Sequence, residues 1–538
     1  MQKNIQLSVL PSEANSELHL KKLIAGTCAA SISSITGFTV LKRSIDARGK
    51  QIKILLHLHV FINEPYQIRE LMQFNFKDVR NAAKRIIIVG AGPAGLFAAL
   101  KFLESGIKPI LVERGKDVKS RRRDLAILNK QGIINPESNY CFGEGGAGTY
   151  SDGKLYTRSS KRGDVSRILN LFVHFGADEK ILYEAHPHIG TNKLPNIITA
   201  IREKIKNCGG EILFETKLVD FIVNSGKLTG IITTAGDKIY ADAVLLATGH
   251  SARDIFELLY SKNILIEAKP FALGVRVEHP QSLIDAAQYH CITRDNSLPP
   301  ASYSLVQQVN GRGVFSFCMC PGGIIAPAAT NPGELVVNGW SPSKRNNPYA
   351  NSGIVVQVTP GDAIRYIKSL NNKTQGLIND PLLLMQFQQL IERKAYETGG
   401  GKFVAPAQRM VDFTNDKISN DLPECSYLPG VKSVSLKNVL PDFVSRSLQQ
   451  AFKEFGKKMP ARYGGKGYFT NDAIVVATES RTSSPVRIPR DATLLQHPQL
   501  KNLYPCGEGA GYAGGIVSAA MDGERCASMA ILQMGKIV

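Results

Sequence analysis

Residues 86–100 read Ile86-Ile-Ile-Val-Gly90-Ala-Gly92-Pro93-Ala94-Gly95-Leu-Phe-Ala-Ala-Leu100, and this stretch decides the fold of the chain. Four apolar, mostly β-branched residues predict a buried parallel strand, and the helix formers after the glycines predict a helix. Gly90 allows the tight turn between them, Gly92 lets a pyrophosphate approach the backbone, and Gly95 lets the helix pack closely on its strand. The first helical turn, which holds Pro93 and Ala94, directs unpaired N–H groups and a positive dipole end at the phosphates. The stretch therefore predicts a dinucleotide-binding site.

A second strand completes this fingerprint. The run Lys108-Pro-Ile-Leu-Val-Glu113 ends in an acid about 20 residues beyond the glycines. Glu113 is placed to accept hydrogen bonds from the ribose hydroxyls of an adenosine. Its charge disfavours a 2′-phosphate, so FAD or NAD fits better than NADP. The G-x-G-x-x-G spacing recurs at 143–148 and 509–514, but only the first match has strand, glycines, helix, second strand and acid in order.

Size and composition limit the class of protein. A chain of 538 residues exceeds what one hydrophobic core usually supports, so we expect two or three domains. The N-terminus has no signal-peptide hydrophobic region, and no apolar run is long enough to span a membrane. The nine cysteines, of which only Cys318 and Cys320 are close together, form neither a disulfide framework nor a metal-ligand pattern. We expect a soluble, cytoplasmic protein without a metal site.

The formal net charge of +19 raises the question of an anionic partner. Nucleic acid or anionic lipid is one interpretation. Apart from Arg121-Arg-Arg123, however, the chain has no long basic run and no basic residues interleaved with aromatic ones. We favour lysines spread over a solvated surface, with a few that serve an anionic cofactor and a small-molecule substrate. Nucleic-acid binding stays open as the less favoured alternative.

The chain divides into four segments around the fingerprint. Residues 1–82 predict a small α/β module with a basic hairpin turn that either contacts an anion or is simply solvated. Residues 83–266 and 491–538 predict the two parts of one dinucleotide-binding domain. Residues 267–490 predict a mixed α+β substrate or cap domain inserted between these parts. The fold class is therefore α/β: a Rossmann-like domain interrupted by a substrate domain, with a small N-terminal α/β module.

Further segments are predicted to approach the cofactor. The segment 142–154 is so rich in glycine that backbone N–H groups can converge on an anion or a planar ring. A strand that begins at Ala243 ends in Thr248-Gly249, where a small residue is needed beside the cofactor. Basic residues after Glu113 either lie near the diphosphate or coat a helix. The predicted contacts in these segments are Arg114, Arg121, Gly145, Gly146, Thr149, Ser151, Asp152, Ala247, Thr248 and Gly249.

The C-terminal segment adds a strand, a glycine turn with Gly507 and Glu508, and a helix at 517–534. With the fingerprint, the acid of the second strand and the Ala-Thr-Gly turn, in this order, it resembles FAD-binding flavoproteins with a glutathione-reductase-like Rossmann domain. The resemblance implies that Glu508 binds the ribityl chain. It also implies that the last helix points its N-terminus, with Gly514, Gly515 and Ile516, at the N1/O2 edge of the isoalloxazine. The helix dipole there stabilises the anionic reduced flavin.

A closer resemblance, over nearly the whole chain, is to a bacterial group of FAD-dependent dehydrogenases whose substrate is uncharacterised. It supports one three-part protein but supplies no reaction. The stretches that carry it are Lys42–Arg48, Phe142–Gly148, Ser151–Leu155, His188–Thr191, Phe317–Gly323, Glu479–Pro485 and Pro505–Ile516.

Catalytic candidates are scattered along the chain. Cys318 and Cys320 are either a buried strand end or redox or nucleophilic groups. The histidines could donate or shuttle protons, or be structural, with His250 the candidate that we retain beside His186 and His188. Arg481 and Lys402 lie in segments suited to an anionic substrate or the polar edge of a flavin. No Cys-x-x-Cys or Cys-x4-Cys stands near the first helix, which argues against a disulfide reductase mechanism.

These observations predict a FAD-dependent oxidoreductase that transfers a hydride between flavin and an unidentified organic substrate. There is no second strand-flanked fingerprint for a dedicated NAD(P)H domain. NAD(P)H could still dock in the inserted domain, or the substrate itself could be the reductant. One rival is a reductase of isoprenoid-like double bonds, which needs a long apolar tunnel in 267–490. Another is an RNA-binding flavoprotein that uses the basic N-terminal module.

Overall fold

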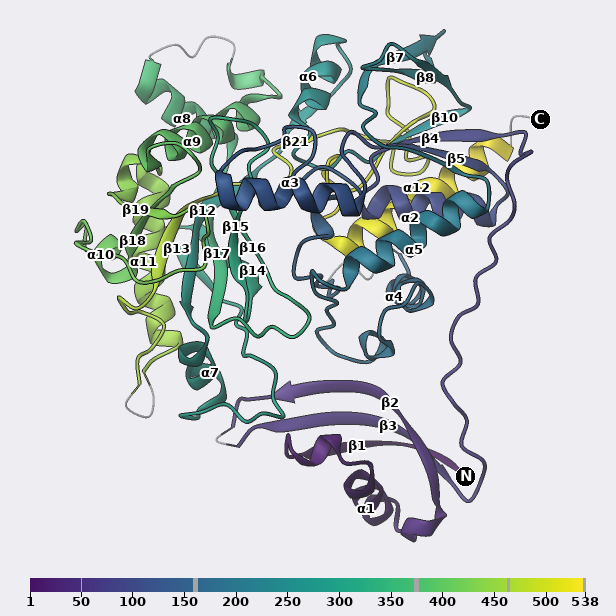
Figure 1. Ribbon diagram of the computed structural model, residues 1–538, viewed down its shortest axis with the longest axis vertical. Helices are drawn as coiled ribbons and strands as arrows, with labels where there is room; N and C mark the ends of the chain where they lie inside the picture. The colour runs from purple at the N-terminus through teal and green to yellow at the C-terminus, as the bar shows by residue number, and fades with distance from the viewer. Residues whose placement is uncertain (50, 158–162, 372–376, 462–464, 536–538) are drawn as a thin grey trace.

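The structure is a computed structural model that describes residues 1–538 except 50, 158–162, 372–376, 462–464 and 536–538. It has an α/β fold in which a parallel sheet and a larger mixed sheet lie side by side, with a small N-terminal module below them (Figure 1). None of the described helices is long and apolar enough to cross a membrane.

A five-stranded parallel sheet in the order β22-β10-β4-β5-β6 carries the fingerprint. It confirms the predicted strand at 86–89, and the strand predicted over 108–113 ends one residue earlier, at Val112. Along β4, alternate side chains serve opposite faces: Ile86 and Ile88 join the core under the helices, and Ile87 and Val89 join the core on the other face. The strands are β4 (Arg85–Val89), β5 (Lys108–Val112), β6 (Glu211–Leu213), β10 (Ala243–Leu246) and β22 (Leu503–Pro505).

Helices cover one face of this sheet, and a smaller sheet covers the other (Figure 1). The helices are α2 (Pro93–Glu104), α5 (Leu194–Asn207) and α12 (Ile516–Gly535), with α3 (Val118–Gln131) and α4 (Val165–His174) nearby. The opposite face holds α6 (Arg253–Ser261) and the antiparallel strands β7 (Leu218–Asn224), β8 (Lys227–Thr233) and β9 (Lys238–Tyr240).

Close backbone approaches hold α2 against β4 and α12. A Cβ on Gly95 would lie 2.0 Å from the carbonyl oxygen of Gly90, and a Cβ on Gly523 of α12 would lie 2.1 Å from that of Ala94. Gly90 itself has a φ of +102°, which favours glycine. The roles that the sequence gives to Gly90 and Gly95 are therefore confirmed.

The chain between β10 and β22 contains a seven-stranded sheet in the order β13-β14-β17-β12-β20-β18-β19. All of its neighbouring strands are antiparallel except β18 and β19. Its strands are β12 (Phe271–Pro280), β13 (Val306–Val309), β14 (Arg312–Cys320), β17 (Tyr349–Val358), β18 (Ala405–Arg409), β19 (Val431–Ser433) and β20 (Ile474–Glu479). Two short pairs accompany it: β15 (Ile324–Pro327) with β16 (Val337–Trp340), and β11 (Glu267–Ala268) with β21 (Val486–Arg487). The helices here are α7 (Gln281–Tyr289), α8 (Pro360–Asn371), α9 (Leu383–Gly399), α10 (Met410–Thr414) and α11 (Asp442–Lys458).

The N-terminal module is an antiparallel sheet in the order β1-β3-β2 with one helix packed on it. Its elements are β1 (Gln2–Val9), α1 (Glu17–Cys28), β2 (Ile35–Asp46) and β3 (Lys53–Ile62). Arg43 joins the module to the segment after α4: its backbone exchanges hydrogen bonds with Tyr183 (2.8 Å) and Ala185 (2.9 Å).

Candidate active site

A cavity of about 860 Å³ lies between the two large sheets. One wall is formed by the segments that follow β4, β5 and β10, together with the start of α12. The facing wall comes from β14, β16 and the segment before β13. Crevices at the carboxyl ends of parallel strands are where ligands bind in sheets of this kind. The cavity is therefore the candidate active site.

The N-terminus of α2 opens into this cavity. Gly92, Pro93 and Ala94 line it, and no side chain caps the helix at Gly92. Helix N-termini leave backbone N–H groups without intrahelical partners, and an anion can satisfy them. Gly95 is not among the lining residues, because it packs against the turn at Gly90. The site fits a dinucleotide diphosphate, with Gly95 in a structural role only.

The carboxylate of Glu113 ties three segments together at the cavity wall. It accepts backbone hydrogen bonds from Ala91 (2.9 Å), Gly115 (2.9 Å) and Gly143 (3.0 Å). An ionised carboxylate has about four acceptor positions, so one is left for a ligand. The sequence identified this acid, but not its bond to the glycine-rich loop. Ribose binding by Glu113 stays a prediction.

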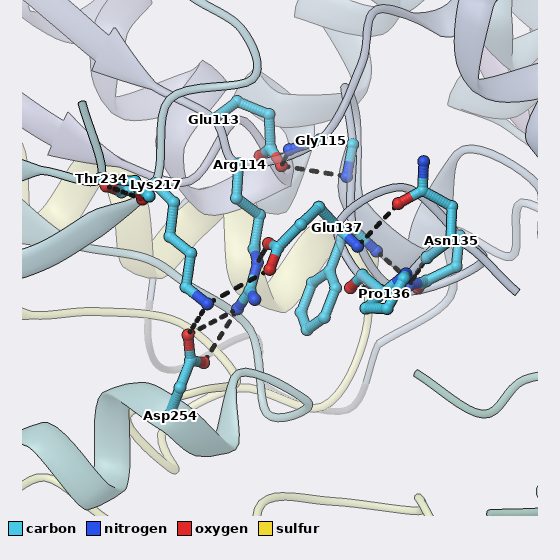
Figure 2. Close-up of polar contacts among 12 residues, drawn as sticks. Glu113, Arg114, Gly115, Asn135, Pro136, Glu137, Lys217, Thr234 and Asp254 are labelled. Carbon is cyan, nitrogen blue, oxygen red and sulfur yellow. Dashed lines mark hydrogen bonds and ion pairs between the residues drawn. The ribbon is translucent and has the colours of Figure 1, made fainter. Parts of the chain in front are cut away.

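Arg114 belongs to a ring of four charges at the same end of the cavity (Figure 2). Its guanidinium pairs with Glu137 (2.5 Å) and Asp254 (2.8 Å), and Lys217 pairs with the same two carboxylates at 3.2 and 2.9 Å. Although burial opposes ionisation, the two cations hold the pKa of both carboxyls below their ordinary values. Because the ring is neutral, Arg114 offers no spare charge to a 2′-phosphate. This agrees with a preference for FAD or NAD.

Arg121 has a different role from the predicted one. Its side chain is fully buried, and it is not among the residues that line the cavity. The guanidinium donates to the carbonyls of the glycine-rich loop, at 2.8 Å to those of Asn139, Glu144 and Gly146. These contacts hold the loop from behind. The prediction of Arg121 near the diphosphate is therefore corrected: it positions the loop and does not reach the cavity.

The glycine-rich loop meets the cavity through only some of its predicted contacts. Gly146, Ser151 and Asp152 line the wall. Gly145 and Thr149 lie behind it, where the Gly145 amide donates to Ala91 (2.8 Å) and the Thr149 hydroxyl donates to Glu144 (2.9 Å). Both residues stabilise the loop instead of contacting a cofactor directly.

The C-terminal turn reaches the same cavity. Glu508 lines it together with six other predicted residues, and Gly507 does not, because its amide donates to Asp522 (2.7 Å). Nδ1 of His250 lies 3.4 Å from Oε2 of Glu508, so residues 258 positions apart in sequence meet at the wall. The other predicted residues that line the cavity are Ala247, Thr248, Gly249, Gly514, Gly515 and Ile516.

Cys318 presents its thiol to the cavity from the facing wall. It lies at an irregularity in β14, between Phe317 and Cys320, with a φ of +45° that non-glycine residues rarely adopt. Its carbonyl accepts from Nη2 of the buried Arg276 (2.7 Å) and from the Cys320 thiol (3.2 Å). The Cys318 side chain is exposed to the open cavity, and desolvation by the protein around the cavity raises the pKa of its thiol above the ordinary value. Cys318 is a neutral thiol here, not a thiolate nucleophile.

Two other catalytic candidates are corrected. Arg481 lines the cavity, but its charge is taken by Glu392 (2.9 Å) and Glu334 (3.2 Å), which also pair with Arg253. Lys402 is exposed and lies outside the cavity, where its carbonyl packs against Gly132. Neither residue offers a free cation to a ligand at this site.

Sequence reasoning missed the cationic groups on the facing wall. Arg345 pairs with Asp152 through two hydrogen bonds, at 2.6 and 3.1 Å. Although burial opposes ionisation, the charge of Arg345 holds the pKa of Asp152 below its ordinary value. Lys154 donates to the carbonyl of Met319. Lys154 falls inside a quoted motif, but no local pattern indicates that Arg345 reaches Asp152 from 193 residues away.

One cluster has metal-ligand chemistry. Ligand atoms of Cys506, Asp522 and Cys526 lie within 4.8 Å of one another. Arg490 donates to both carboxylate oxygens of Asp522 (3.0 and 2.6 Å) and to the sulfur of Cys526 (3.0 Å). The guanidinium therefore occupies the ligand atoms that a metal cation would need.

Fold and site together define the class of protein: residues 270–482 belong to a family of FAD-dependent proteins, and over nearly its whole length the chain belongs to one family with a bacterial relative. Residues 270–482 match the family model described as "FAD-dependent protein, C-terminal domain-like", and residues 1–61 match a domain of unknown function. An uncharacterized protein of Clostridium beijerinckii is 41% identical over 526 residues, which cover 94% of this chain and 95% of that protein. This relative shows that the family extends over the whole chain, N-terminal module included.

More distant similarities are weaker. The thiamine thiazole synthase of Aeropyrum pernix is 26% identical over 182 residues, which cover 31% of this chain and 55% of that protein. The structure of the flavin-dependent brominase Bmp2 matches at 14% identity and a TM-score of 0.34, with coverage of 84% of this chain and 79% of that chain. At these values neither likeness supports an argument about the reaction.

Proposed function

We propose that this protein transfers a hydride between FAD and a small organic substrate inside the cavity. The observation that carries the proposal is that residues of both walls line a single cavity. The first wall bears the open end of α2, Glu113 and Glu508, and the second bears the neutral thiol of Cys318. When bound, FAD supplies the two-electron chemistry.

The residues of the chain would bind and orient the cofactor and would assist the reacting substrate. Gly92 and Ala94 bind the diphosphate, and Glu508 orients the ribityl chain, with His250 fixing the Glu508 carboxylate. The start of α12, at Gly514 and Gly515, directs its dipole at the flavin. Cys318 can donate a hydrogen bond or a proton to the reacting substrate, because its thiol stays protonated.

The facing wall also supports a polar substrate over an isoprenoid. Ser302, Ser304, Ser316 and Asn338 line the cavity there, so this wall is not an apolar tunnel. The RNA-binding alternative is weakened in a similar way. In the N-terminal module, Arg48 pairs with Asp46 (2.7 Å) and Arg43 lies 3.8 Å from Glu184.

An anaerobic titration of the FAD-loaded protein with NADH and NADPH tests the proposal. Bleaching of the flavin bands by one nucleotide identifies the electron donor. If neither nucleotide bleaches them, dithionite-reduced protein should be reoxidised by organic acceptors without oxygen. A flavin that no nucleotide reduces and no acceptor reoxidises would contradict the hydride-transfer proposal. Cys318→Ser should slow reoxidation by an organic acceptor, and Cys425→Ser, which alters a cysteine outside the cavity, should not.

A further inference from the structure

Among the cations that line the cavity, Lys154 is the one without an ion-pair partner among the described residues. Arg114 and Lys217 pair with Glu137 and Asp254, Arg345 pairs with Asp152, and Arg481 pairs with Glu334 and Glu392. The residues outside the described ranges include no Asp or Glu. The positive charge of Lys154 therefore has no ion-pair partner at the cavity within the described ranges.

Lys154 also lies where a substrate would react. Its ammonium donates to the carbonyl of Met319, the residue next to Cys318, so the charge lies close to the Cys318 thiol. Arg345 faces the same cavity, and within the described part of the chain its Nη1 has no hydrogen-bond acceptor. Together Lys154, Arg345 and Asp152 carry a net charge of one positive unit. That charge matches one carboxylate.

We propose that Lys154, assisted by Nη1 of Arg345, binds the carboxylate of a small organic acid and places the rest of that substrate beside Cys318. Burying a lone ammonium in a cavity wall is costly, and a bound carboxylate satisfies it. A single point charge is a good partner for a monoanion. This inference rests on the proposed function and names the substrate class of the same site.

The test uses matched probes that differ in charge alone. The FAD-loaded protein is titrated with acetate, pyruvate and benzoate, and with acetamide, pyruvamide and benzamide as neutral counterparts. Binding is followed through perturbation of the flavin spectrum and through calorimetry, so no turnover is needed. At least one carboxylate should bind saturably and more tightly than its amide.

Two substitutions distinguish binding at Lys154 from a general effect of the protein's positive charge. Lys154→Met should weaken carboxylate binding about tenfold or more, leave amide binding unchanged and preserve FAD affinity. Lys402→Met removes a lysine outside the cavity and should change nothing. Absence of saturable carboxylate binding, equal binding of the amides, or an unaffected Lys154→Met protein would each overturn the inference. Loss of FAD affinity in Lys154→Met would assign the lysine to the cofactor and overturn it as well. A protein that takes up no FAD would instead contradict the proposed function itself.

Discussion

At the scale of single residues, the surroundings set the chemistry of Cys318 on β14 and of Glu278 on β12, two strands separated by β17. Cys318 is held by Arg276, whose guanidinium also pairs with Glu479 at 3.0 Å. Glu278 is buried on β12 and accepts from the backbone and hydroxyl of Ser426. Desolvation by the protein around the cavity raises the pKa of Cys318, and burial raises the pKa of Glu278 to about 7.

The raised pKa of Cys318 predicts slow alkylation. A thiol whose pKa is raised above 9.0 carries less thiolate at neutral pH, and the thiolate is the reactive form. Iodoacetamide labelling of the FAD-free protein, quantified by mass spectrometry against glutathione, should therefore be slower for Cys318 and should accelerate with pH. Labelling of Cys318 as fast as glutathione at pH 7 would contradict the account.

The raised pKa of Glu278 predicts a pH-dependent stability. Between about pH 4.5 and 7 the unfolded carboxyl ionises while the folded one stays protonated, so the wild type loses stability as pH rises through that window. Glu278→Gln does not titrate. The difference in unfolding free energy between wild type and Glu278→Gln, from denaturant titrations, should therefore fall across this window and level off on both sides. A difference independent of pH would show that Glu278 is not shifted.

At the scale of elements, the contact between β4 and α2 positions the diphosphate site. The site opens at Gly92, and its geometry depends on Gly95 lying directly against the Gly90 carbonyl. The sequence predicted this contact because strand, turn and helix are consecutive and the glycine spacing reports their packing.

Gly95→Ala should therefore displace α2. The added Cβ would lie 2.0 Å from the Gly90 oxygen, and such overpacking costs about 1–3 kcal/mol. We expect a lower melting temperature and loss of FAD retention. Gly26→Ala in α1 is the matched control, because a Cβ there meets no atom within 4 Å and should stabilise the helix by about 1 kcal/mol. Equal FAD retention in the two variants would contradict this role of Gly95.

The positions of other side chains in the site could not be predicted from the sequence, for a physical reason. Arg121 and Thr149 lie in segments that the sequence placed correctly near the cofactor. The sequence does not show whether these side chains face the cavity or the loop behind it. For Arg121 this depends on contacts with residues 18 to 25 positions away, and for Thr149 it depends on a local turn. Lys402 was placed by a glycine-rich pattern that proved to end α9, not to line the cavity.

At the scale of the whole molecule, a buried ion-pair network joins the two large parts. Arg253 begins α6, Glu392 lies in α9, and Arg481 follows β20, with Glu334 bridging both arginines. All four side chains are almost fully buried. Although burial opposes ionisation, the two arginines hold the pKa of Glu392 below its ordinary range. No sequence pattern pairs residues so far apart, which is why the sequence alone predicts a ligand-binding role for Arg481.

Glu392→Gln should strongly destabilise the protein. It leaves two buried guanidinium groups with one carboxylate, and breaking a buried pair typically costs about 3–5 kcal/mol. Glu397→Gln, on the exposed side of the same helix, should cost less than about 0.5 kcal/mol. Denaturant unfolding followed by circular dichroism measures both. Equal stability of the two variants would mean that the network contributes little to joining the parts.

The flavin content of the purified protein tests the central claim most directly. After incubation with FAD and removal of the excess, the protein should show the visible absorption bands of a bound flavin. Denaturation should then release one FAD per chain. A protein that remains colourless after this treatment would contradict the assignment of the cavity as a flavin site.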